Sequence, residues 1–172
     1  MLISDTAERS AAYRYGGITL FLAAGVILTA LGFQYIGGYA PCPLCLMQRY
    51  AYYASIPLLF IAMALVSEMP RLAALIFFAV ALAFLANAGL AGYHAGVEWK
   101  FWPGPETCGT AQALPTSAAD LLSGLNETHV VRCDEAAWTF AGLSMAGWNV
   151  IISLVLFATA LKAAFLSSST RS

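Results

Sequence analysis

The segment from Arg71 to Tyr93, RLAALIFFAVALAFLANAGLAGY, decides the fold, because no charged residue follows Arg71 before Glu98. A helix needs about 20 apolar residues to cross the hydrocarbon core of a membrane. In lipid, a helix also satisfies its own backbone hydrogen bonds. The sequence therefore predicts a membrane-spanning helix over residues 71–93.

The composition of the whole chain agrees with a membrane protein. Of its 172 residues, 60% are hydrophobic and only 10% are charged, whereas soluble domains carry roughly 25% charged residues. The net charge of −1 shows no basic excess that would indicate nucleic-acid binding. We predict an all-α membrane protein, a four-transmembrane-helix bundle forming a single domain over residues 1–172. The expected spans are about 16–36, 47–67, 71–93 and 139–163.

The connections between these spans predict how the protein lies in the membrane. With four spans, the first and third connections share one side, so all four cysteines face the same compartment. The third connection is a long loop, about 94–138, in which Ser117 marks the start of a short amphipathic helix. Basic residues concentrate on the other side. We therefore expect both termini in the cytoplasm and the cysteines outside, where disulfides persist. The basic residues are Arg9, Arg14, Arg71, Lys162 and Arg171.

The four cysteines, at positions 42, 45, 108 and 133, allow several interpretations. A C-x-x-C pair occurs in zinc sites, structural disulfides and redox centres. Cys108 and Cys133 lie too far apart for the second half of a four-cysteine zinc site, so we expect no metal. A disulfide between Cys42 and Cys45 closes a very small ring and stabilises the fold little. This favours a redox role for that pair.

The residues around the pair indicate how it could react. Pro43 suits the first turn of a helix, which places Cys42 near the N-cap, where a thiolate is stabilised. Arg49 lies four residues after Cys45 and shares its helix face. It could stabilise negative charge there or only reach for lipid headgroups. His94, at the end of the third span, is an isolated histidine, and such a residue is more often a satisfied or solvated side chain than a catalyst.

Three stretches together resemble the DsbB family of bacterial inner-membrane disulfide bond formation proteins. They are Pro-Cys-Pro-Leu-Cys-x3-Arg ending at Arg49, the isolated Cys108, and the segment from Cys133 to Trp148, CDEAAWTFAGLSMAGW. The resemblance covers essentially the whole chain. It implies a quinone-dependent oxidase that re-oxidises a periplasmic thioredoxin-like dithiol oxidase of the DsbA type. Electrons would pass to ubiquinone or menaquinone.

The resemblance also implies roles for individual residues. Cys108 and Cys133 match a loop disulfide that meets the partner, and Cys42 and Cys45 match the pair that re-oxidises it. Cys45 would face the quinone. The residues matching positions beside the quinone are Arg49, His94, Met145 and Trp148. Gln48 stands where some members have an acidic residue, so it is given no role.

Two alternatives belong to other classes of protein. One is a quinone-linked thiol reductase of the vitamin K epoxide reductase kind, in which the C-x-x-C opens the last span rather than the second. The other is a non-enzymatic membrane scaffold stapled by disulfides. Coupled consumption of quinone and partner thiols distinguishes the oxidase from both.

Overall fold

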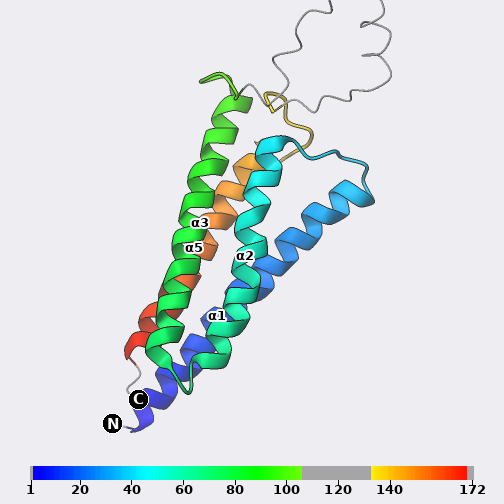
Figure 1. Cartoon of the computed structure of the whole chain (residues 1–172). Coiled ribbons are helices and arrows are strands. Elements are labelled where there is room, and N and C mark those ends of the chain that lie inside the picture. Colours follow the sequence, from blue (N-terminus) through cyan, green and yellow to red (C-terminus); the bar gives the residue numbers. More distant parts are fainter. Residues whose placement is uncertain (1, 106–132, 170–172) are drawn as a thin grey trace, which may run out of the picture.

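The computed structural model describes residues 2–105 and 133–169. In this part of the chain four helices and two short strands form. The helices are α1 (Leu2–Tyr35), α2 (Pro43–Leu65), α3 (Pro70–Glu98) and α5 (Met145–Ser169), and the strands are β1 (Thr139–Phe140) and β2 (Leu143–Ser144). The helices run side by side as a bundle, and α1 leans away from α2 toward its Tyr35 end (Figure 1). Cys108 and the predicted loop helix near Ser117 lie outside the described residues.

Three of the described helices are long and apolar enough to cross a membrane: Thr6–Tyr35 of α1, Pro70–Glu98 and Met145–Ser169. The chain is therefore a helical membrane protein. Helix α2 is less apolar, because Gln48 and Arg49 lie in its first half and Pro57 lies inside it.

The core of the bundle follows from the spacing of small and large apolar residues on α3. Phe77, Val80 and Phe84 are fully buried, and their separations of three and four residues place them on one helix face. This face packs against α5 and α2, and α1 also packs against α5 and α2. A Cβ on Gly16 of α1 would lie 2.9 Å from the ring of Phe77. Glycine thus lets α1 approach the core closely.

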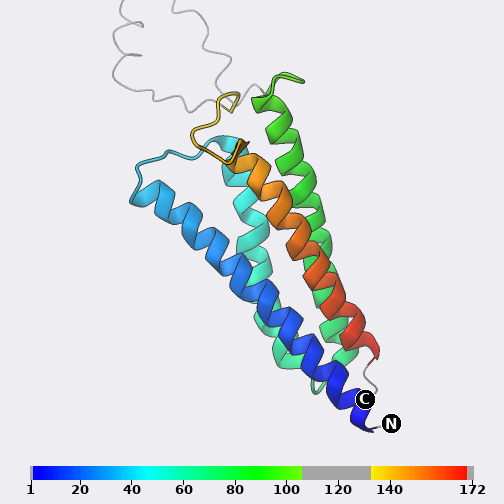
Figure 2. The same ribbon diagram turned by 180° about the vertical axis from the view of Figure 1, so that it is seen from behind.

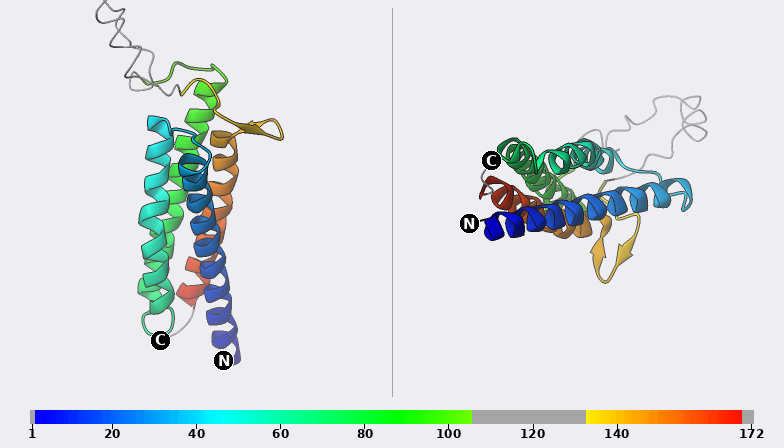
Figure 3. Two further views of the ribbon diagram at one scale, coloured as in Figure 1. Left: turned by 90° about the vertical axis from the view of Figure 1, so that its right-hand side faces the viewer. Right: turned by 90° about the horizontal axis from the view of Figure 1, so that it is seen from below.

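The start of α5 differs from the expected fourth span. Residues 139–144, which we expected inside the span, form an antiparallel hairpin in which Phe140 pairs with Leu143. The two turn residues, Ala141 and Gly142, have φ values of 51° and 79°. Positive φ at both positions is typical of a type I′ turn, which matches the twist of a two-stranded hairpin. The hairpin stands out beside the bundle where α5 begins (Figure 3).

Different segments of the protein lie at the two ends of the bundle. Both chain termini and the connection between α2 and α3 lie at one end (Figures 1 and 2). There Ser167 Oγ donates a hydrogen bond to the Pro70 carbonyl over 2.9 Å. The start of α2, the hairpin and the end of α3 lie at the opposite end. Because α3 continues to Glu98, His94 belongs to this helix rather than to the predicted loop.

Candidate redox site at the start of helix α2

Cys42 and Cys45 form a disulfide at the N-terminus of α2. Pro43 occupies the first turn and Cys42 is the N-cap, with its sulfur accepting a hydrogen bond from the Cys45 backbone N–H over 3.1 Å. This confirms the helix start that the sequence predicts. Cys42 is buried, with 3% of its surface exposed, whereas Cys45 is partly exposed. Cys45 is therefore the more accessible sulfur of the pair.

Cys133 lies beside this pair. It is fully buried in one apolar cluster with Cys42, Leu44 and Val97, and Cys45 packs against the same cluster. Cys133 is itself disulfide-bonded. The structure thus brings together three of the four predicted cysteines at one end of the bundle. Cys108 lies outside the described residues.

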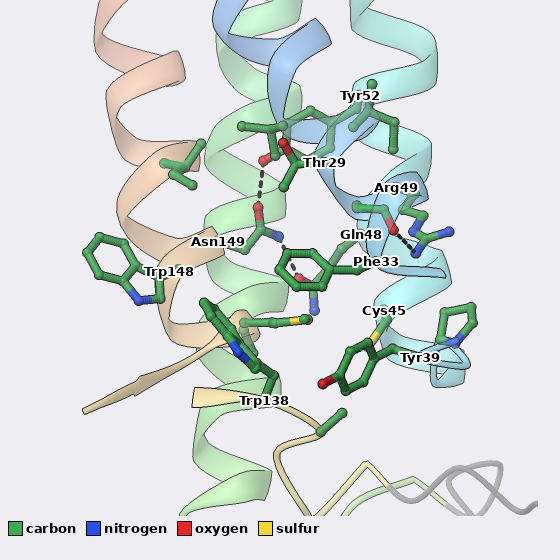
Figure 4. Close-up of a pocket in the computed structure, with 18 of the residues that line it drawn as sticks. Thr29, Phe33, Tyr39, Cys45, Gln48, Arg49, Tyr52, Trp138, Trp148 and Asn149 are labelled. Atoms are coloured by element: carbon green, nitrogen blue, oxygen red, sulfur yellow. Dashed lines mark hydrogen bonds between the residues drawn. The ribbon is translucent and has the colours of Figure 1, made fainter. Parts of the chain in front are cut away.

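A cavity of about 670 Å³ adjoins Cys45 (Figure 4). Its walls come from α1, α2, the end of α3, the connection before α2 and the first turns of α5. Most of the lining side chains are apolar or aromatic. The predicted site residues that line it are Cys45, Arg49, His94, Met145 and Trp148. Organic ligands and cofactors bind in cavities of this size and character.

Arg49 is fixed to the wall of this cavity. Its guanidinium donates one hydrogen bond to Gln34 Oε1 and another to the Ala30 carbonyl at 3.3 Å, both on α1. These contacts within the bundle distinguish it from a side chain that only reaches for headgroups. Gln34 was not predicted as a site residue, since only its position on a facing helix connects it to Arg49.

Aromatic rings line the cavity on the hairpin side. Trp138 lies between Phe33, at 5.3 Å between ring centroids, and Phe140, at 5.7 Å in a stacked arrangement. Trp148 donates a hydrogen bond from Nε1 to the Phe140 carbonyl over 3.0 Å. The hairpin therefore holds Trp138 and Trp148 at the cavity. Their positions would not follow from a fourth helix that began at residue 139.

His94 contacts groups on both α2 and α3. Its Nε2 lies 3.7 Å from the Cys42 sulfur and 3.8 Å from Glu98 Oε1. Its Nδ1 is hydrogen-bonded to the side-chain nitrogen of Gln48 over 3.0 Å. The histidine is 4% exposed and Gln48 is 5% exposed. Gln48, for which no role was predicted, is therefore part of the site.

Cys42, Cys45 and His94 also form a group whose potential metal-binding atoms all lie within 4.8 Å of one another. Thiolates bind metal ions, but the two sulfurs here are joined in a disulfide. Binding would require reduction of the pair and an unprotonated His94 nitrogen. In the oxidised protein, this group consists of a disulfide beside a buried histidine.

Comparison with known proteins agrees with this geometry. The relatives include disulfide bond formation protein B of Methylococcus capsulatus, 36% identical over 83% of this chain and 87% of the relative. The protein of the same name from Herminiimonas arsenicoxydans is 33% identical over 84% of this chain and 89% of the relative. No solved structure matches the chain. Residues 14–163 match the family described as disulfide bond formation protein DsbB, and the chain therefore belongs to the DsbB family of membrane disulfide oxidoreductases.

Proposed function

We propose that the chain re-oxidises a periplasmic thioredoxin-like dithiol oxidase of the DsbA type and passes the electrons to ubiquinone or menaquinone in the bacterial inner membrane. The observation that carries this proposal is the position of Cys45. It belongs to a disulfide and also lines a large apolar cavity. A sulfur in this position can exchange with thiols and can also meet a lipid-soluble oxidant.

The cavity suits a quinone ring. It is lined mainly by apolar and aromatic side chains, and its few polar groups lie at defined positions on α1, α2, α3 and α5. Arg49 lies in its wall and supplies a permanent positive charge near Cys45. A quinone bound there would accept two electrons and two protons, and the protein would supply position and electrostatics. Met145 and Trp148 would hold the ring by packing.

The cysteines would act in sequence by thiol–disulfide exchange. A partner thiolate attacks Cys108 of a Cys108–Cys133 disulfide, and Cys133 leaves as a thiolate. Cys133 then attacks the Cys42 sulfur; the bond from Cys133 to Cys42 forms, and the bond from Cys42 to Cys45 breaks. The electron pair leaves on Cys45, at the cavity. The second partner thiol then displaces Cys108, and Cys108 attacks Cys133, so that the oxidised partner is released, the Cys108–Cys133 disulfide re-forms and Cys42 leaves as a thiolate. The shared cluster of Cys133 and Cys42 supports this order.

The proposal includes the membrane topology. All four helices would cross the membrane as one domain, with the loop of about 94–138 in the periplasm and a short amphipathic helix in that loop. The arrangement of the ends supports this, because the termini and the α2–α3 connection lie together, at the opposite end of the bundle from the start of α2 (Figure 1). The basic residues near the end with the termini are Arg9, Arg14, Arg71 and Lys162.

Replacement of Cys45 by serine tests the function. With a reduced thioredoxin-like partner and ubiquinone, the purified wild-type protein should oxidise partner thiols and consume quinone in equal amounts. Cys45→Ser should abolish quinone consumption, while non-reducing mass spectrometry should still find the disulfide of Cys133. Ser55→Ala, which changes a buried residue of α2, is the control. Undiminished quinone consumption by Cys45→Ser would contradict the proposal, and a wild-type protein without quinone consumption would favour a scaffold.

A further inference from the structure

A chain of hydrogen bonds runs from His94 into the bundle. Gln48 bonds to His94 Nδ1 through its side-chain nitrogen, and its Oε1 accepts a hydrogen bond from Asn149 Nδ2 over 2.5 Å. Asn149 Oδ1 in turn accepts a hydrogen bond from the Tyr52 hydroxyl over 2.5 Å. Figure 4 shows Asn149 between Tyr52 and Gln48 at the wall of the cavity. The chain thus joins α2, α3 and α5.

The chain continues away from the cavity. Ser153 Oγ donates to Asn149 Oδ1 at 3.4 Å, and Asn87 Nδ2 donates to Ser153 Oγ at 3.0 Å. Gln48, Tyr52, Asn87 and Ser153 are all buried. Polar side chains at such positions in a membrane bundle are costly unless they are paired, and they mark functional sites. A packed apolar core would stabilise the fold as well, so stability alone does not account for this chain of hydrogen bonds.

This chain of hydrogen bonds determines which nitrogen of His94 carries the proton. The side-chain nitrogen of Gln48 can only donate, so Nδ1 of His94 accepts and the proton of the neutral ring lies on Nε2. Gln48 keeps this orientation because its oxygen accepts from Asn149. Asn149 keeps its own because its oxygen accepts from Tyr52 over 2.5 Å and, over the longer distance of 3.4 Å, from Ser153. Nε2 is the nitrogen that lies 3.7 Å from the Cys42 sulfur.

We propose that Gln48, Asn149 and Tyr52 are positioning residues that direct the Nε2–H of His94 at the sulfur of Cys42. When the pair is reduced, this N–H stabilises the Cys42 thiolate as a charge-assisted hydrogen-bond donor. The inference rests on the proposed redox function of the pair. It assigns His94 to Cys42, whereas Arg49 serves the Cys45 side of the cavity.

The thiolate matters when the disulfide of the pair re-forms. The bond between Cys42 and Cys45 forms as the two thiols lose two electrons and two protons, which the proposed quinone accepts. Cys42 must approach Cys45 as a nucleophile, and a thiolate is the nucleophilic form. A donor held against Cys42 therefore favours closure of the disulfide.

The His94 ring also has a hydrogen bond to the Cys133 backbone, and ionisable groups of α2 and α3 lie close to it. Glu98 on α3 lies against Nε2, and its Oε2 is buried without a hydrogen-bond partner among the residues that the structure describes. On α2, Cys45 adjoins Cys42, and the Arg49 guanidinium bonds to α1. The facing stretch of α1, residues 21–35, and the first turns of α5, residues 145–153, contain no charged residue. Cys133 is disulfide-bonded. Asn149→Leu and Tyr52→Phe leave both His94 and Glu98 in place, so a charged Glu98 would oppose the thiolate equally in these two variants.

The test measures the reactivity of Cys42 alone. The full-length chain carries Cys45→Ser, Cys108→Ser and Cys133→Ser, and the rate of alkylation of Cys42 by iodoacetamide is followed by mass spectrometry against pH. In this background Asn149→Leu and Tyr52→Phe should raise the midpoint pH, leaving about tenfold less thiolate below the midpoint, as expected for a lost hydrogen bond to a charged group. His94→Ala should give the same shift. Ser55→Ala, the matched loss of a buried hydroxyl on α2, should give none.

Combination of the variants separates positioning from a general structural effect. If the chain of hydrogen bonds acts through His94, Asn149→Leu should not shift the midpoint pH further in a protein that already carries His94→Ala. The proposal would be overturned if Asn149→Leu shifted the midpoint pH equally in proteins with and without His94. It would also be overturned if neither Asn149→Leu nor Tyr52→Phe changed the midpoint pH. The assay needs neither partner nor quinone. Its outcome is therefore distinct from that of the quinone-consumption assay.

Discussion

Arg49 contributes both a charge and interhelical hydrogen bonds to the wall of the cavity. It donates to Gln34 and to the Ala30 carbonyl, so it joins α2 to α1 while it presents positive charge to the cavity. A lysine in its place carries the same charge but lacks the planar arrangement of several donors. The position of the charge would then no longer be fixed by α1.

We therefore expect Arg49→Lys to impair the quinone step selectively. The KM for ubiquinone should rise about tenfold, the scale of one lost hydrogen bond to a charged group. Exchange with the reduced partner, measured without quinone, should stay at the wild-type rate. Gln34→Leu should raise the KM less, because the Ala30 carbonyl still accepts from Arg49. An equal fall of both rates in Arg49→Lys would show that the arginine acts on the fold rather than on the cavity.

Residues in local sequence motifs could be predicted, and those paired across helices could not. The N-cap position of Cys42 follows from the neighbouring proline, and Arg49 follows from its spacing to Cys45. Asn149 and Gln48 are 101 positions apart, and no local pattern relates them. Only the packing of α2 against α5 makes them partners. The role of Gln48 was missed for this reason.

At the scale of elements, the hairpin before α5 shows a similar limit. Residues 139–144 contain no charge and read as the beginning of a span, yet they form two paired strands. The decisive feature is the left-handed backbone at Ala141, with φ of 51°. Alanine at this position does not predict a left-handed conformation, whereas asparagine before glycine would. The apolar pattern therefore predicted the helix but not the residue at which it begins.

The two turn residues make a matched test of the hairpin. Ala141→Gly should stabilise the protein in detergent by about 1 kcal/mol, since the left-handed conformation costs an L-residue about 1–2 kcal/mol. Gly142→Ala should destabilise it by a similar amount, because the φ of 79° then carries a Cβ. Thermal unfolding followed by tryptophan fluorescence measures both. Opposite signs for the two variants are expected, and the same sign in both would contradict a type I′ turn.

At the scale of the whole molecule, the number of membrane crossings depends on α2. This helix is less apolar than the others, but its polar residues Gln48, Arg49 and Tyr52 line the internal cavity. Its 23 residues extend about 35 Å at 1.5 Å per residue, which is enough for a hydrocarbon core of about 30 Å. A low average hydropathy thus does not prevent α2 from spanning, because the polar groups need not face lipid.

Single cysteines test this topology directly. In a chain whose four native cysteines are serine, Ser67→Cys lies between α2 and α3, and Thr139→Cys lies in the hairpin at the opposite end; both positions are exposed. In intact spheroplasts an impermeant maleimide should label Thr139→Cys and leave Ser67→Cys unlabelled until the membrane is permeabilised. If α2 does not cross, the chain has three spans and its termini face opposite compartments. With four spans, Ser168→Cys, near the end of α5, should instead remain unlabelled, and its labelling in intact spheroplasts would rule out the four-span arrangement.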